Sequence, residues 1–261
     1  MKPVLIAALT AMLVLPAMAQ ENALQPSSEA WDDLRESVVG LEADPPVDAA
    51  ILDLNAPVRA NDAAIVPFRI TQPADAPALT DMMVVIDNNP APVAAEYTFG
   101  QALMPLDFEV RMRVDAYSDV RVIATTTGGD KVMAGRFVKA SGGCSAPAGK
   151  DMAAMAETMG QMRWRAAPGD DGRMIGTLMI RHPNFSGLQR DQVTLLNIPA
   201  HFIADLQVRQ GDETLFTMAA GISVSEDPVI RFSYRPNGEP ISVHAEDTDG
   251  NIWDQTFEVA G

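Results

Sequence analysis

The chain has 261 residues, of which 47% are hydrophobic and 21% are charged, and this composition excludes an intrinsically disordered chain. The length is sufficient for one large domain or two ordinary ones. A formal net charge of −16 argues against binding to nucleic acid or to an anionic membrane surface, because both repel an acidic protein.

Residues 1–19 are predicted to be a secretory signal peptide. Lys2 supplies the positive charge, an apolar run follows over residues 3–15, and Ala17-Met18-Ala19 fits the small-x-small cleavage pattern. The apolar run is shorter than the roughly 20 residues that span a bilayer. We therefore expect a mature chain that starts near Gln20, lies in a periplasm-like compartment and has no membrane anchor.

Residues 20–55 are predicted to form an N-terminal helical extension. Ser27 and Ser28 are candidate N-caps, and Gly40 lies near the expected end of the helix. Apolar residues follow at helical spacing: Trp31, Leu34, Val38 and Leu41. Pro45-Pro46 ends the helical segment.

Residues 56–140 have the pattern of a β-sandwich. Phe108, Val110, Met112 and Val114 alternate with charged residues, as in a half-buried strand. Further short strands are expected at residues 65–70, 82–86, 120–126 and 132–138. Turn residues at 88–90 and 128–130 separate them, which favours an antiparallel arrangement.

Residues 141–165 are predicted to be a linker that carries a cysteine and continues into a methionine-rich helix. Gly142, Gly143 and Ser145 surround Cys144, so the segment has little apolar area to bury. The methionines fall on one helical face: Met152, Met155, Met159 and Met162.

Residues 166–261 are predicted to form a second sandwich. Strands are expected at residues 174–180, 230–234 and 241–245, where apolar and polar residues alternate. Asn237-Gly238 and Asp249-Gly250 are typical of tight hairpins. The predicted fold is all-β, with two antiparallel sandwiches joined by the linker and the short helix.

Cys144 is the only cysteine, so an internal disulfide is excluded. Its small neighbours predict an exposed and mobile thiol, and no histidine lies near it in the sequence to act as a fixed base. This pattern indicates an attachment site on which other enzymes act. The alternative is an incidental surface thiol. A thiol packed inside a core would contradict the interpretation.

The sequence resembles the fused SoxYZ-like carriers associated with periplasmic quinoprotein dehydrogenases. The first half resembles the SoxY subunit of the thiosulfate-oxidising Sox system and the second half its SoxZ partner. The first half shares residues 66–70, 88–92 and 110–114 and Gly142-Gly143-Cys144, and the second half shares residues 182–187, 198–203, 221–223 and 226–228.

This resemblance implies immunoglobulin-like sandwiches and a sulfur intermediate attached to Cys144, with residues Gly142, Gly143 and Ser145 in the carrier arm. It implies no catalytic residue, no metal and no cofactor beyond the adduct itself. Implied partners are periplasmic sulfur-oxidising enzymes, a quinoprotein dehydrogenase and c-type cytochromes. The stand-alone carrier ends just after a Gly-Gly-Cys-Gly-Gly arm, whereas here Ser145-Ala146-Pro147 follows and the chain continues.

Two other functions stay open at this level. The chain could be a non-covalent docking protein of a dehydrogenase–cytochrome system, or a copper chaperone that uses Cys144 and the methionine face. His182 and His201 could pair as metal ligands or as an acid–base pair, although structural or interface roles are favoured, and residues 247–251 fit a hairpin turn better than a calcium loop. The sequence contains none of the common nucleotide-binding or hydrolase motifs, and we expect a protein that is not an enzyme.

Overall fold

A computed structural model describes residues 22–26, 28–147, 155 and 157–259. The predicted signal peptide and Met152 lie outside the described residues. Within the described part of the chain, no helix has the length and apolar character needed to cross a membrane.

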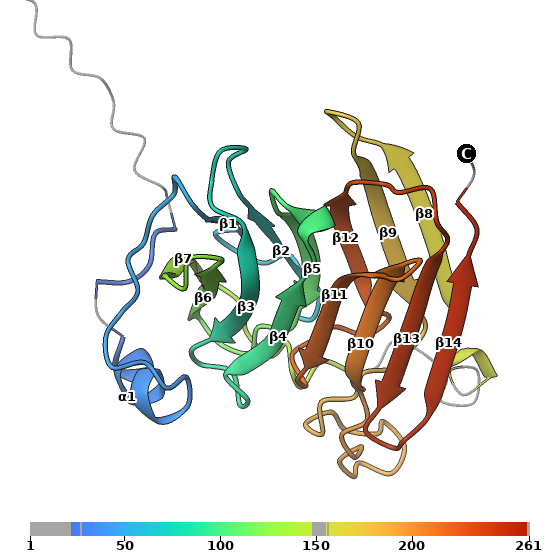
Figure 1. Cartoon of the computed structure of the whole chain (residues 1–261). Coiled ribbons are helices and arrows are strands. Elements are labelled where there is room, and N and C mark those ends of the chain that lie inside the picture. The colour runs from blue at the N-terminus through green and yellow to red at the C-terminus, as the bar shows by residue number, and fades with distance from the viewer. Residues whose placement is uncertain (1–21, 27, 148–154, 156, 260–261) are drawn as a thin grey trace, which may run out of the picture.

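The secondary structure of the described chain is mostly β-strand (Figure 1). The helix α1 (Glu29–Ser37) precedes the strands, and the 3-10 turn η1 (Gln101–Leu103) interrupts them. Met155, Glu157 and Thr158, in the segment where the sequence predicts the methionine-rich helix, are helical as well. The strands of the first half are β1 (Asp53–Asn55), β2 (Val66–Thr71), β3 (Leu79–Ile86), β4 (Val93–Phe99), β5 (Asp107–Met112), β6 (Ser118–Thr126) and β7 (Lys131–Val138). Those of the second half are β8 (Met162–Pro168), β9 (Met174–Ile180), β10 (Ile203–Gln210), β11 (Glu213–Ala220), β12 (Val229–Tyr234), β13 (Ile241–Asp247) and β14 (Ile252–Phe257).

These strands form two antiparallel sheets, and each sheet runs through both halves of the molecule. The six-stranded sheet has the order β1-β2-β5-β12-β9-β8, and the eight-stranded sheet has the order β14-β13-β10-β11-β4-β3-β6-β7. The halves meet where β5 pairs with β12 and where β4 pairs with β11. Backbone pairing thus joins the halves in both layers, and the all-β antiparallel prediction is confirmed.

Side-chain packing joins the two halves in addition to the predicted linker. Phe108 of the first half packs against Phe216 and Phe232 of the second, with ring centroids 5.3 and 6.3 Å apart. All three side chains are fully buried and belong to one hydrophobic cluster that extends through both halves. Apolar patterning predicts which face of a strand is buried, but it does not reveal that an edge strand of one half continues the sheet of the other.

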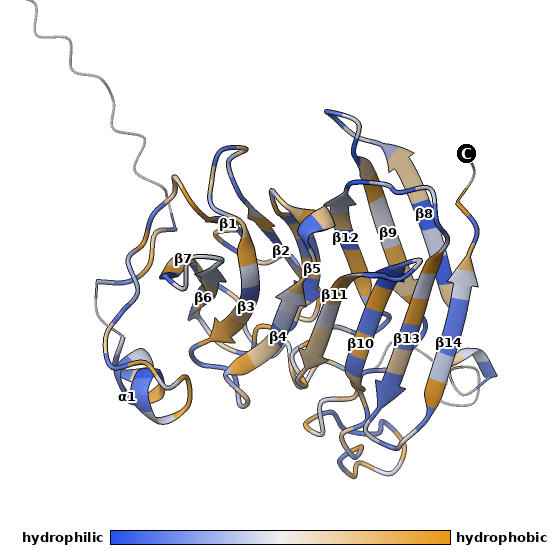
Figure 2. Ribbon diagram, in the orientation of Figure 1, coloured by the Kyte–Doolittle hydropathy of each residue, from blue (hydrophilic) through white to orange (hydrophobic). Residues whose placement is uncertain are grey.

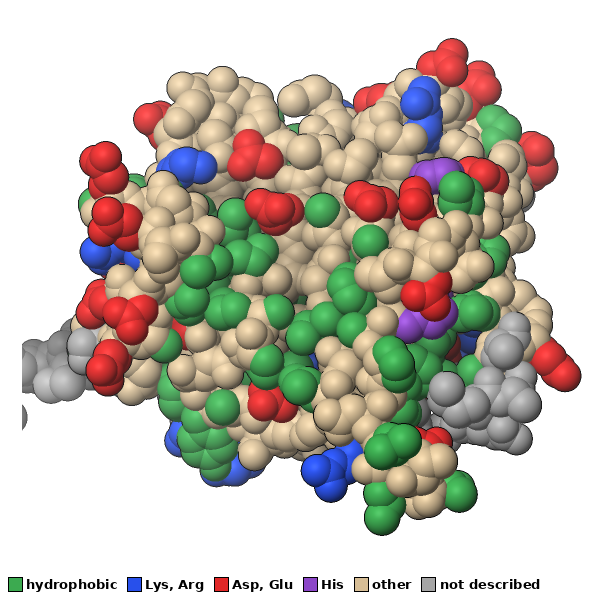
Figure 3. Space-filling model, turned by 90° about the horizontal axis from the view of Figure 1, so that it is seen from below, with side chains coloured by type: hydrophobic (Ala, Val, Ile, Leu, Met, Phe, Trp, Pro, Cys, Tyr) green, Lys and Arg blue, Asp and Glu red, His purple; other side chains and the backbone are tan. Residues whose placement is uncertain are grey.

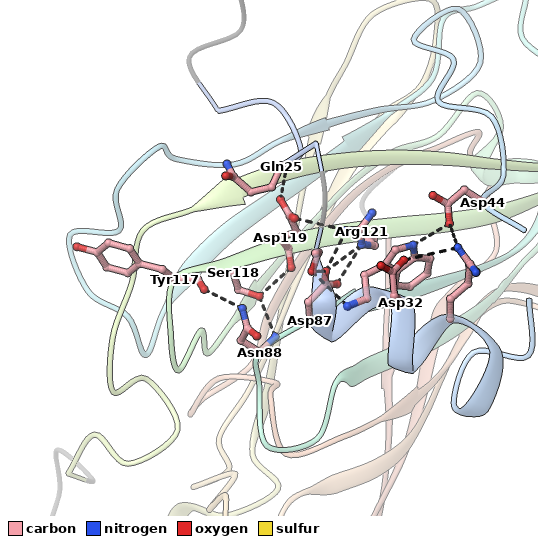
Figure 4. Close-up of polar contacts among 12 residues, drawn as sticks. Gln25, Asp32, Asp44, Asp87, Asn88, Tyr117, Ser118, Asp119 and Arg121 are labelled. Atoms are coloured by element: carbon pink, nitrogen blue, oxygen red, sulfur yellow. Dashed lines mark hydrogen bonds and ion pairs between the residues drawn. The ribbon is translucent and has the colours of Figure 1, made fainter.

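The helix α1 covers the outer face of the eight-stranded sheet. The Oγ of Ser28 caps it by accepting a hydrogen bond from the N–H of Trp31, as the sequence predicts. Trp31 is buried, and the guanidinium of Arg121 lies 4.3 Å from its ring centroid. Arg121 in turn bonds Asp87 and Asp119, so a charged network fixes the helix to the sheet (Figure 4).

Strand positions follow the sequence patterns where burial alternates, as it does along β13. Figure 2 shows the same alternation of hydrophobic and hydrophilic residues along neighbouring strands. Two expectations are wrong. Met162 begins β8 instead of lying on a helix, and Asn237-Gly238 is not a hairpin, because β12 and β13 belong to different sheets. Asp249-Gly250 does connect the paired strands β13 and β14.

Candidate functional site

Cys144 lies in a turn that crosses from the first half to the second. We name residues 142–147 the Cys144 turn. Cys144 has 0% exposure, so the prediction of an exposed thiol is wrong. The thiol nevertheless lies outside both hydrophobic clusters, and the neighbouring Ser145 and Pro147 are exposed. The turn is therefore at the surface, and only the cysteine side chain points inward.

The first half fixes the turn through Asp115. Its Oδ1 accepts a hydrogen bond from the N–H of Cys144 at 3.0 Å, and its backbone oxygen accepts one from Gly142 at 2.7 Å. The N–H of Gly143 donates to the backbone oxygen of Val114 at 3.2 Å. The segment between β5 and β6 thus holds the turn in place from the side of the first half.

The second half covers the turn from the other side. The Oγ of Ser186 donates a hydrogen bond to the carbonyl oxygen of Cys144, and the Nε2 of Gln189 donates to the carbonyl oxygen of Ala146 at 3.1 Å. Ser186 and Gln189 are themselves buried and bonded to each other. The two halves of the chain therefore hold the thiol between them.

Gly143 is required here for close packing. A Cβ at this position would lie 2.2 Å from the carbonyl oxygen of Ala63 and 2.6 Å from that of Val114, both of which are backbone atoms. Gly142 has a φ of +75° and open space around it, so it serves the backbone turn itself. The glycines that suggested flexibility in the sequence allow the turn to fit tightly against its neighbours.

Burial and, to a smaller extent, the nearby Asp115 carboxylate together raise the pKa of the Cys144 thiol to about 11, against the opposing effect of Arg113. The thiol is therefore protonated at neutral pH in this conformation. Because the thiolate is the nucleophile, the enclosed cysteine is chemically protected.

An open hollow of about 440 Å³ adjoins the turn. Ala146 and Pro147 line one side of it, and Gln189 and Glu226 belong to the second half. Arg113 lines it as well and donates to the backbone oxygens of Ile222 and Val224. The hollow leaves free space beside the Ala146–Pro147 end of the turn.

A second polar site lies in the second half, where His182, His201 and Asp247 form a histidine cluster. The Oδ2 of Asp247 lies 2.7 Å from the Nε2 of His201 and 3.3 Å from the Nε2 of His182. His182 and Asp247 are buried, and His201 is partly exposed. The structure therefore brings together the two histidines that the sequence suggested as a pair and adds Asp247, which the sequence analysis did not select.

The hydrogen bonds of the cluster favour a structural role over metal binding. The Nδ1 of His182 accepts the N–H of Asn184 at 3.0 Å, so the proton of the neutral ring is on Nε2, which points at Asp247. Burial keeps His182 neutral by lowering its pKa. A metal-binding histidine instead offers the lone pair of one nitrogen and donates from the other. The cluster thus closes the β13–β14 hairpin, as the structural interpretation of the histidines expects.

Burial by itself would raise the pKa of Asp247, but hydrogen bonds from Asn251, His201 and His182 lower it below its ordinary value. The Oδ1 of Asp247 accepts the backbone N–H groups of Asp249 and Asn251. Its side chain therefore organises residues 247–251, which confirms the hairpin interpretation of that segment.

Comparison with known proteins agrees with the division into two halves. The family model described as sulfur oxidation protein SoxY matches residues 36–144, and the model described as sulphur oxidation protein SoxZ matches residues 162–258. The chain belongs to the SoxYZ-like proteins, with both domains fused in one polypeptide. Proteins of this family are carriers of the sulfur-oxidation system, and the SoxY match ends at Cys144.

One solved structure similar to this fused SoxYZ-like chain is the sulfur carrier protein SoxY from Chlorobium limicola f thiosulfatophilum. It shares 24% identity and covers 43% of this chain and 97% of its own, with a TM-score of 0.34. No curated protein sequence matches the chain significantly.

Residues that contact the Cys144 turn were not identified as site residues from the sequence. In the sequence, Asp115 looks like a solvent-facing residue of a strand. Gln189 lies 45 positions beyond the cysteine, in a segment without periodicity. Ser186 falls within the stretch 182–187 that carries the resemblance to SoxZ, and that stretch was the available signal.

Proposed function

We propose that the chain carries a sulfur-containing group as a covalent adduct on the Sγ of Cys144 and presents it to partner enzymes in a periplasm-like compartment. The observation that carries the proposal is that the SoxY match ends on the only cysteine of the chain, which lies in a surface turn. Sulfur-oxidising enzymes are the proposed partners, together with c-type cytochromes as electron acceptors.

Loading requires the turn to leave its position, because the thiol is enclosed. Only the hydrogen bonds from Ser186 and Gln189 link the second half to the turn among the described contacts. A hydrogen bond of this kind contributes about 1 kcal/mol, so releasing the turn from the second half costs about 2 kcal/mol. The bonds to Asp115 and Val114 of the first half add about 1 kcal/mol each where the movement breaks them. The hollow beside Ala146 and Pro147 provides space for the movement.

Opening also activates the cysteine. With a pKa of about 11, on the order of one thiol in ten thousand is ionised at pH 7. A solvated cysteine with a pKa of about 8.5 is ionised to roughly 3% at the same pH. Exposure and reactivity therefore rise together, which protects the resting thiol from unspecific oxidation.

With thiosulfate as the incoming sulfur compound, the step forms one S–S bond between Sγ and the outer sulfur. The thiol releases one proton, and the pair of reactants releases two electrons, so an external acceptor of the cytochrome class is required. The product is a Cys144 S-thiosulfonate with one negative charge.

Intact-mass measurement of the protein purified from its source cells tests the proposal. We expect a mass increase that a thiol reductant removes and that is absent from the Cys144→Ser variant. Ser145→Ala, an exposed neighbour, is the matched control and should carry the adduct normally. An unmodified cysteine in cells that are oxidising thiosulfate, or full function of Cys144→Ser, would contradict covalent carriage and would favour a docking role.

A further inference from the structure

The loop between β9 and β10 exposes an unusual amount of apolar surface. It projects beyond the ends of the strands (Figure 1), and residues 188–197 are named the apolar loop. Val193 is 90% exposed, and Leu195 and Leu196 are 68% and 69% exposed. Single exposed apolar residues are ordinary, but a contiguous group is typical of a binding surface.

The apolar loop has a defined conformation. The Oδ1 of Asp191 accepts the backbone N–H groups of Val193 and Thr194, and the N–H of Asp191 donates to the carbonyl oxygen of Leu196 at 2.9 Å. Leu195 has a φ of +60°, a backbone conformation that leucine rarely adopts. These bonds stabilise a loop whose apolar side chains point into solvent, so the exposure is a fixed feature of the fold.

The same segment of chain covers the cysteine. Ser186, two positions before the apolar loop, and Gln189, its second residue, donate the hydrogen bonds to the Cys144 turn. A protein bound to the outer side of the loop is therefore adjacent to the thiol. Seen from below, hydrophobic side chains occupy this projecting part and continue over the centre of the same face (Figure 3).

The charge at the base of the loop indicates which kind of partner surface would complement it. Arg190 is exposed at the base of the loop and has no ion pair with any described residue, although the chain as a whole carries 35 acidic against 19 basic residues. An exposed arginine without a partner beside apolar side chains complements an apolar hollow that is bordered by a carboxylate.

We propose that the apolar loop is the docking surface for the enzyme that exchanges cargo with Cys144, and that this enzyme offers an apolar hollow with an acidic border. The inference rests on the proposed carrier function and adds to it the surface that the partner recognises. Docking places the partner against Ser186 and Gln189, the residues whose bonds must break for the thiol to become accessible.

The test compares Val193→Asp with Val47→Asp. Both residues are exposed, at 90% and 60%, and Val47 lies in the first half, so neither substitution disturbs a core. Each full-length chain is incubated with soluble extract of thiosulfate-grown source cells and with thiosulfate, and the Cys144 adduct is followed by intact mass. We expect Val193→Asp to slow adduct formation by at least about tenfold, as for a central interface residue, and Val47→Asp to match the unmodified chain.

Arg190→Glu supplies a second variant. It should slow loading by about threefold at low salt and less at high salt, because a charge at the border of an interface acts mainly on the association rate. Iodoacetamide needs no docking, so its reaction rate with Cys144 should be equal in all the variants.

The outcomes separate the two proposals. If the unmodified chain loads and Val193→Asp loads at the same rate, the docking surface is wrong and the carrier function stands. If the unmodified chain does not load, the carrier function fails and the docking inference fails with it. A dimer of the unmodified chain that Val193→Asp dissociates, seen by light scattering, would show that a second copy occupies the loop and would also overturn the inference.

Discussion

The Cys144 turn and the histidine cluster are two buried polar sites that differ in how many bonds fix them. Asp247 accepts hydrogen bonds on both carboxylate oxygens from two histidines and from residues of its own hairpin. The sulfur of Cys144 accepts no hydrogen bond from a described residue, and only the backbone of its turn is held, by Asp115 and Val114 of the first half and by Ser186 and Gln189 of the second. Burial by itself therefore does not distinguish a structural site from one that can open, but the number and charge of the bonds do.

The largest expected effect is at the histidine cluster, which is the more firmly fixed of the two sites. Asp247→Asn should lower the free energy of unfolding by about 3 kcal/mol, because it removes the charge that several buried donors share. Urea unfolding measures the change. Asp254→Asn is the control in the same hairpin: its carboxylate is exposed and pairs only with His244, so it should cost below about 0.5 kcal/mol. Equal losses in both variants would remove the distinction between the two sites.

In the Cys144 turn, a steric change should alter the reactivity of the thiol more than the stability of the fold. Gly143→Ala places a methyl group against two backbone oxygens, so the turn must shift and Cys144 should react with iodoacetamide at least about tenfold faster, which corresponds to roughly 1.4 kcal/mol. Gly142→Ala, with open space around the added group, isolates the cost of the backbone conformation. An unchanged reaction rate in Gly143→Ala would mean that the turn does not need its present position to shield the thiol.

Acid should weaken the histidine cluster in a defined range. Because burial lowers the pKa of His182 below its ordinary value of 6.5, the unfolded chain binds this proton more readily than the folded chain. The stability from neutral His182 is thus complete above pH 6.5 and is lost as pH falls below that value, with a slope of up to about 1.4 kcal/mol per pH unit. Unfolding curves measured across this range should lose the slope in His182→Gln and keep it in His244→Gln, whose ring is 43% exposed.

The smallest expected effect tests the cover over the cysteine. Gln189→Ala removes the hydrogen bond to Ala146, which is worth about 1 kcal/mol, and should speed iodoacetamide labelling of Cys144 by roughly fivefold. It also removes the bond that the Gln189 side chain accepts from the Ser186 N–H, so the free energy of unfolding should fall by about 1 kcal/mol. Gln192→Ala, which removes a bond within the exposed loop, should leave labelling unchanged. Labelling that tracks global unfolding in every variant would show that the turn opens only when the whole chain does.

Local patterns in the sequence predicted much of the fold. Alternation located strands such as β9 and β13, where one face is buried and the other is not, and the Ser28 cap marked the start of α1. Strands such as β11 were not predicted, because burial does not alternate along them: in β11 the adjacent Leu215 and Phe216 are both buried. The Asn237-Gly238 hairpin failed for a related reason: a turn sequence specifies a local bend, but not the sheet that the next strand joins.

The sequence by itself determined that there is one thiol, that it lies between two β-rich halves, and that small residues surround it. Only the tertiary structure decided that this thiol is enclosed, because the residues of the second half that bond to its turn, Ser186 and Gln189, lie more than forty positions away in the sequence. A glycine such as Gly143 is compatible with a mobile segment and also with close packing against backbone. Here the backbone oxygens of Ala63 and Val114 lie so close that Gly143 is required for packing. The composition of a segment limits the conformations that it can adopt, and contacts with residues distant in the sequence select one of them.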